Sequence, residues 1–164
     1  MTEVSARTDD DAKDRRHMQA ALDAARRGML AGEPPVGANL VRDNESLATL
    51  GNGVISDLDI TAHAEMRVIR AACQNLRKLS LNGCTLYVTV EPCPMCLSAC
   101  HYAGVDRIVW GASLDDMHAV TGSELTIHYA DFAAGGIRID VRGDCMGEES
   151  RLLLGKWSRG LRRA

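Results

Sequence analysis

The stretch CTLYVTVE (residues 84–91) restricts the possible folds of this chain more than any other feature. Its apolar and β-branched residues run almost without interruption, which is typical of a strand buried on both faces of a sheet. Pro92 ends the strand, and Pro94 suits the first turn of a helix that we expect to reach about Ala103. A buried strand that leads directly into a helix predicts a layered α/β domain.

Strands and helices alternate along the rest of the chain, which also favours the α/β class. Apolar residues recur at helical spacing at Met18, Leu22, Ala25 and Met29. In the first half of the chain, the patterns predict a helix at 9–31, strands at 36–43 and 46–54 joined by a polar turn at Asp43–Asn44, and a helix at 63–76. In the second half, they predict a strand at 107–113, a weak helical stretch at 123–133 and a short strand at 137–142. A final helix is expected at 145–163, with Leu153, Leu154, Trp157 and Leu161 on its inner side.

The 164 residues fit one domain, which we expect at 9–164 after a flexible N-terminal tail at 1–8. The net charge of −3 gives the whole surface no general attraction for nucleic acid. No apolar run approaches the roughly 20 residues of a membrane span, and the N-terminus lacks the apolar core of a secretory signal. We therefore expect a cytoplasmic protein without a membrane partner.

The segment EPCPMCLSACH (91–101) holds three of the six cysteines. Cys93 and Cys96 are three residues apart, so both side chains can face the same way from the first helical turn. The helix N-terminus stabilises negative charge and favours thiolates. Such a pair is half of a zinc site or half of a redox motif, whereas the other cysteines are expected to pack in the interior.

A second group, His63 and Glu65, stands at the start of the predicted helix at 63–76. With Cys93 and Cys96, His63 would give a metal three protein ligands and one open position, as in catalytic zinc sites. A spacing of two does not place side chains on one helix face, so His63 must lie in the first turn or its cap. Glu65 would then be near enough to accept a proton from metal-bound water.

The residues His63-Ala64-Glu65 and Pro92-Cys93-Pro94-Met95-Cys96 resemble the H-x-E…P-C-x-x-C signature of zinc-dependent nucleobase deaminases. The resemblance, to the cytidine-deaminase-like superfamily, runs from about Glu33 to Gly111. It implies a three-layer α/β/α fold with a central mixed five-stranded sheet, and usually a homodimer. It also implies one Zn²⁺ per chain on His63, Cys93 and Cys96.

In that superfamily a zinc hydroxide attacks the amino-bearing ring carbon, and ammonia is released. The resemblance gives Glu65 the role of proton shuttle. Two alternatives outside this class remain: a redox CxxC, and a structural zinc with Cys100 or His101 as fourth ligand.

Asn52 lies in the sequence GNG after a predicted strand. Gly and Asn tolerate a positive φ, so the segment can be a simple turn. In guanine deaminases and tRNA adenosine deaminases, an asparagine before the HAE helix binds the substrate, and the resemblance gives Asn52 this role.

Two substrate classes fit the resemblance. The segment EPCPMCLSA is similar to that of guanine deaminases, which carry an acid after the following strand; Glu124, or the pair Asp115-Asp116, is the candidate here. We therefore expect a small-molecule substrate, a guanine-like nucleobase or nucleoside. The alternative is a tRNA-specific adenosine deaminase, because AHAE and LYVTVEPC are shared with that family and the last segment, 151–164, is basic. The His-Ser-Arg-like element of those enzymes is absent.

Overall fold

A mixed five-stranded sheet forms the centre of the protein, as the resemblance implied. The computed structural model describes residues 2–161, with the side chains of residues 10–160. The strand order is β2-β1-β3-β4-β5. The strands are β1 (Gly37–Arg42), β2 (Glu45–Gly51), β3 (Cys84–Val90), β4 (Arg107–Ala112) and β5 (Asp140–Arg142). β1 is antiparallel to β2 and β3, whereas β3, β4 and β5 are parallel.

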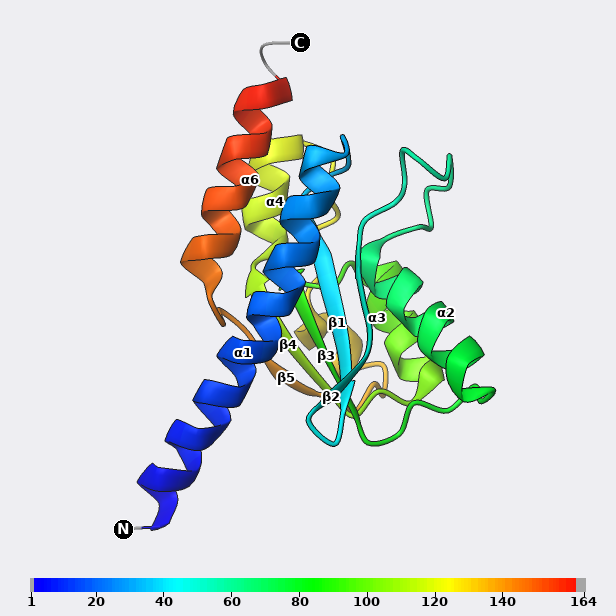
Figure 1. Cartoon of the computed structure of the whole chain (residues 1–164), viewed down its shortest axis with the longest axis vertical. Helices are drawn as coiled ribbons and strands as arrows, with labels where there is room; N and C mark the ends of the chain where they lie inside the picture. The colour runs from blue at the N-terminus through cyan, green and yellow to red at the C-terminus, as the bar shows by residue number, and fades with distance from the viewer. Residues whose placement is uncertain (1, 162–164) are drawn as a thin grey trace.

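Helices cover both faces of the sheet, so the protein has the three predicted layers (Figure 1). On one face lie α1 (Thr2–Leu30) and α6 (Gly147–Leu161), with α4 (Leu114–Thr121) against α6. On the other lie α2 (Ala64–Leu76) and α3 (Pro94–Ala103); the short α5 (Tyr129–Ala133) precedes β5. Within residues 2–161, no helix is both long enough and apolar enough to cross a membrane.

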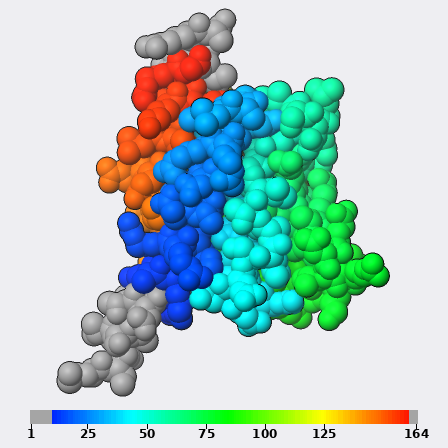
Figure 2. Space-filling model, in the orientation of Figure 1, coloured from blue at the N-terminus to red at the C-terminus, as the bar shows by residue number. Residues whose placement is uncertain are grey.

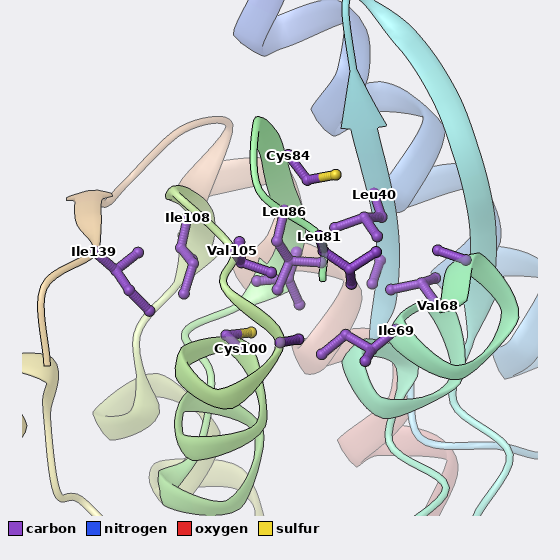
Figure 3. Close-up of a cluster of buried hydrophobic side chains, with 14 of the residues drawn as sticks. Leu40, Val68, Ile69, Leu81, Cys84, Leu86, Cys100, Val105, Ile108 and Ile139 are labelled. Carbon is purple, nitrogen blue, oxygen red and sulfur yellow. The ribbon is translucent and has the colours of Figure 1, made fainter. Parts of the chain in front are cut away.

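The main core lies between the sheet and helices α2 and α3 (Figure 3). Leu40, Leu86 and Ile108, from three neighbouring strands, meet Val68 of α2 there, and none of them is exposed. The alternate residues of the same strands point to the other face, because side chains alternate along a strand. β3 is thus buried on both faces, which confirms the prediction from CTLYVTVE.

The opposite face of the sheet packs against α1, which runs alongside α6 (Figure 2). Met18, Leu22 and Ala25 are buried as the helical spacing predicted. A Cβ at Gly37 of β1 would collide with the backbone carbonyl of Ala21. Only glycine therefore lets α1 lie this close to the strand.

The first helix begins earlier than predicted, whereas the predicted end of the last helix, at residue 163, lies outside the described residues. α1 begins at Thr2, not at Asp9, and its backbone includes residues 2–8, for which a flexible tail was predicted. The side chains there and Met1 lie outside the described residues, so flexibility stays a prediction. Leu161 also lies outside the described side chains, whereas Leu153 and Leu154 of α6 are buried as predicted.

The predicted helical stretch at 123–133 is wrong in its extent. A helix forms earlier, as α4, because Ser113 and Asp116 make a reciprocal capping box at its start. Gly122 ends that helix with a φ of 69°. Only α5 remains of the predicted stretch, and the chain from 122 to 128 is irregular. β5 is likewise confined to Asp140–Arg142.

A buried carboxylate ties α1 to the sheet. Asp14 is 1% exposed and accepts two hydrogen bonds of 2.8 Å from Arg107, one of 2.8 Å from Arg142 and one of 2.9 Å from Tyr87. Burial alone would raise the pKa of Asp14, but the hydrogen bonds from Arg107 and Tyr87 and the two guanidinium charges outweigh it and lower the pKa below its ordinary value. The ionised form therefore stabilises the fold.

We expect Asp14→Asn to lower the free energy of unfolding by roughly 2–3 kcal/mol at pH 7, because it leaves two partly buried guanidinium groups without their counter-charge. Because the folded pKa of Asp14 is depressed, this stabilisation is present above the unfolded pKa and is lost as the pH falls through the folded value. Urea unfolding of both proteins across this pH range measures it. Asp10→Asn, an exposed change on the same helix, is the control; equal losses in both variants would contradict the prediction.

Candidate active site

Two helices begin at the same place and bring the predicted ligands together. His63 is the N-cap residue of α2, and Cys93 is the N-cap residue of α3. Both have extended backbones, and neither side chain caps its own helix. His63 Nδ1 lies 3.6 Å from Cys93 Sγ and 3.5 Å from Cys96 Sγ. His63 thus occupies the cap position that the two-residue spacing to Glu65 required.

The three side chains fit a metal ion. Their ligand atoms all lie within 4.8 Å of one another. Tetrahedral zinc, with bonds of about 2.3 Å to sulfur and 2.0–2.1 Å to nitrogen, would separate such atoms by about 3.6 Å, which agrees with the distances to His63. Cys100 is buried outside this group and His101 is exposed. Among the described residues, the set is therefore three ligands, the number found in catalytic sites.

The pKa values of the two thiols are shifted in opposite directions. A hydrogen bond from Cys96 and another with His63 outweigh burial and lower the pKa of Cys93 to about 4. The same bond to Cys93, together with burial, raises the pKa of Cys96. The contact between the two thiols thus favours the thiolate at Cys93, and binding of a cation would displace the proton of Cys96.

Glu65 is buried beside these ligands, with 3% of its surface exposed. Burial, and then the negative charge of Cys93, raise its pKa to about 7. Among the described residues, its Oε2 atom has no hydrogen-bond partner. Buried carboxylate oxygens are normally satisfied, so this atom is available to a water or a substrate proton. A carboxyl group with this pKa can hold or release a proton near neutrality.

A cavity of about 250 Å³ opens at the ligands and Glu65. Its walls are largely apolar and include Leu114, Met117 and Trp157. Its polar and charged lining residues include Asn52, His63, Glu65, Glu91, Cys93 and Glu124. A small planar ring with polar edges suits such a space, because apolar walls bind its faces and the polar groups fix its orientation.

Both predicted substrate-binding residues lie in this cavity lining. Asn52 is 7% exposed, and its Oδ1 accepts a hydrogen bond from the N–H of Gly53. Burial and the negative charge of Cys93 raise the pKa of Glu124. The Asp115-Asp116 pair is not part of the lining: Asp116 caps α4, and Asp115 is exposed.

The sequence interpretation missed Glu91, Thr121 and Trp157, which also line the cavity. Glu91 offered a signal, since a charged residue ends the otherwise apolar run of β3. Thr121 and Trp157 offered none, because their place in the cavity depends on how α4 and α6 pack together.

This arrangement, a buried carboxyl group beside three residues that can hold zinc on a mixed sheet, fits a zinc-dependent deaminase. Residues 11–112 match the family described as the cytidine and deoxycytidylate deaminase zinc-binding region. The chain belongs to this family. It is therefore an enzyme of the deaminase class, a hydrolase acting on C–N bonds, and the non-enzymatic alternatives are set aside.

The curated relatives of this chain carry names that refer to different substrates. The chain is 40% identical over 125 residues to a tRNA-specific adenosine deaminase of Agrobacterium fabrum, covering 73% of this chain and 82% of that protein. It is 39% identical over 100 residues to guanine deaminase of Bacillus subtilis, covering 60% and 64%. It is also 44% identical over 126 residues to a tRNA(Ile)-lysidine synthase of Deinococcus deserti, which covers 74% of this chain but spans only 24% of that protein.

Solved structures share the fold. A structure from studies of A-to-I editing by tRNA:A34 deaminases matches with a TM-score of 0.75 and 34% identity, covering 84% of this chain and 98% of that one. The match thus extends over nearly the whole of that chain.

Replacement of one ligand tests the metal site. We expect the wild-type chain to hold one zinc ion and Cys93→Ala to lose it, because two ligands remain. Inductively coupled plasma mass spectrometry of the purified proteins gives the zinc content per chain. Cys73→Ala, which removes a half-buried thiol of α2 outside the ligand set, is the control. Undiminished zinc in Cys93→Ala would contradict the assignment.

Proposed function

We propose that the protein is a zinc-dependent hydrolytic deaminase of a purine, and that its first candidate substrate is an adenosine in tRNA, with inosine as the product. The observation that carries this choice is the similarity to tRNA-specific adenosine deaminases over most of the chain, including the structural match over 98% of a tRNA:A34 deaminase. This similarity favours an adenosine in tRNA, the alternative given above, over the guanine-like substrate that the sequence led us to expect.

The zinc ion would lie at the N-terminal ends of α2 and α3, held by His63, Cys93 and Cys96. Bound zinc lowers the pKa of water from about 15.7 to roughly 7 and so supplies a nucleophile at neutral pH. The N-terminal ends of both helices place partial positive charge at the same point, which stabilises the two thiolates.

Glu65 would move the protons. Its unsatisfied Oε2 atom and its pKa of about 7 suit a group that accepts a proton from water and passes it to the ring nitrogen and the leaving amine. Asn52 would orient the ring: with its Oδ1 engaged by Gly53, its NH₂ group remains as a donor to an acceptor on the purine. The apolar walls at Leu114, Met117 and Trp157 would exclude bulk water from the reacting edge.

A guanine-like base is the second candidate, and Glu124 is the observation that favours it. An ionised carboxylate only accepts hydrogen bonds, and guanine presents adjacent N–H donors on its ring nitrogen and amine. Among the residues that line the cavity there is no Lys or Arg, so the cavity itself has no cation to bind a phosphate of RNA. A small neutral base is compatible both with the hydrogen-bond acceptor at Glu124 and with a cavity lining that has no Lys or Arg.

One assay separates the two substrates. Purified, zinc-loaded protein is incubated with guanine, guanosine, adenine, adenosine, cytosine and cytidine, and ammonia is measured; unmodified tRNA is assayed in parallel for inosine. We expect inosine in tRNA. Release of ammonia from guanine, with no inosine formed, would instead select the second candidate. No reaction with any of them would contradict the proposed function.

Glu65→Gln tests the proton shuttle. The variant keeps the shape of the side chain and the three metal ligands, so we expect it to retain zinc while turnover falls by about 10²–10⁴-fold. Turnover and zinc content are measured on the same preparation. Glu45→Gln, an exposed change in β2, is the matched control. Turnover close to that of the wild type in Glu65→Gln would exclude the shuttle.

A further inference from the structure

An irregular segment between α4 and α5, residues 122–128, reaches the cavity. It begins at Gly122, where φ is 69°, and carries Ser123 and Glu124 into the cavity lining. The next apolar side chains, Leu125 and Ile127, are 60% and 42% exposed. Little apolar burial therefore fixes the segment, and its position depends on polar contacts.

Two histidines hold the segment, one through the backbone of Glu124 and one as the last residue of the segment. His118 Nδ1 lies 2.8 Å from the backbone carbonyl of Glu124. At the other end, His128 Nδ1 lies 3.0 Å from both carboxylate oxygens of Glu91. The Nε2 atom of His128 faces Asp115 at 3.5 Å. The imidazole of His128 is thus placed between two acidic side chains.

Glu91 connects this contact to the rest of the site. It is 6% exposed, follows β3 and lies two residues before Cys93. Its Oε2 also accepts a hydrogen bond of 3.1 Å from the N–H of Leu114, the first residue of α4. One buried carboxylate therefore joins the end of β3, the start of α4 and the end of segment 122–128. A buried carboxylate needs such partners, so the bond with His128 is strongly favoured.

We propose that His128 is a positioning residue for the substrate: its bond to Glu91 holds segment 122–128 against the cavity and so fixes the carboxylate of Glu124 inside it. The inference rests on the proposed deaminase function with its guanine-like candidate substrate, and it deepens that function by naming what positions the residue that would accept hydrogen bonds from the base. A purine that offers N–H donors to Glu124 would depend on this contact for binding. The chemistry at Glu65 would depend on it less, because among the described residues no hydrogen bond joins Glu65 to His128 or to segment 122–128.

The test compares His128→Ala with His128→Asn. Asn places an amide N–H near the position of the imidazole Nδ1, so it can keep the bond to Glu91 while giving up the contact with Asp115. We expect His128→Ala to raise the KM for a guanine-like substrate by about ten- to a hundredfold, since misplaced binding groups have effects of this size, with kcat within about twofold. His128→Asn should recover most of the loss. His101→Ala, an exposed histidine of α3, is the control.

Binding is measured separately from turnover. The probe is 2,6-diaminopurine, titrated into zinc-loaded protein by calorimetry in the Glu65→Gln background, with thermal melting of every variant alongside. Weaker binding in His128→Ala, rescue in His128→Asn and unchanged melting support the inference. Unchanged KM and affinity in His128→Ala, or a loss that follows a lower melting temperature and is not rescued, overturns it.

These outcomes distinguish a failure of the positioning role of His128 from a failure of the proposed deaminase function. Normal turnover in the wild type, with no effect of His128→Ala, overturns the positioning role alone. Purine binding that depends on His128, in a wild-type enzyme that deaminates no substrate, supports the positioning role and overturns the proposed function alone.

Discussion

The convergence of two helix N-termini is the constraint on which the site depends. β3 leads through Pro92 directly into α3, and α2 packs beside α3 on the same face of the sheet. His63 and Cys93 each stand where a side chain would ordinarily cap its own helix, and both instead face a common point. The unpaired N–H groups and dipoles of both helices therefore act on one small volume, where they favour anionic ligands and an incoming nucleophile. The sheet keeps this point fixed, because it sets the relative positions of the two helices.

Buried carboxylates in this protein fall into two kinds. Asp14, Glu33 and Glu91 are each almost inaccessible, and each is satisfied by several donors: guanidinium groups for Asp14, the N–H groups of Ile55 and Ser56 for Glu33, and Leu114 and His128 for Glu91. Among the described residues, Glu65 is the one buried carboxylate that keeps an oxygen without a donor. The first kind joins distant segments, and the second remains available for chemistry. Full burial therefore does not by itself identify a catalytic acid; the missing partner does.

The parts of the fold that local sequence determines were predictable. The run at 84–91, the prolines around Cys93 and the turn at Asp43–Asn44 each specify backbone geometry within a few residues, and each lies where it was expected. The ligand set could be inferred because residue type and spacing carry the chemistry of zinc. Segment 122–128 could not be inferred in this way: its shape depends on His128 meeting Glu91, 37 residues earlier in the chain. Trp157 likewise reaches the cavity only because α6 packs against α4, a contact that no local pattern reveals.

The residues that line the cavity come from two parts of the chain, one before and one after residue 112. The metal-ligand side, with Asn52, His63, Glu65 and Cys93, lies within residues 11–112, the part that matches the deaminase family. The other part of the lining, from Leu114 to Glu124 and at Trp157, comes after residue 112. The proposed reacting groups thus lie in one portion of the polypeptide, and much of the remaining cavity lining lies in the portion that follows it. Changes confined to the second portion would therefore alter the shape of the cavity while leaving the three ligand residues and Glu65 in place.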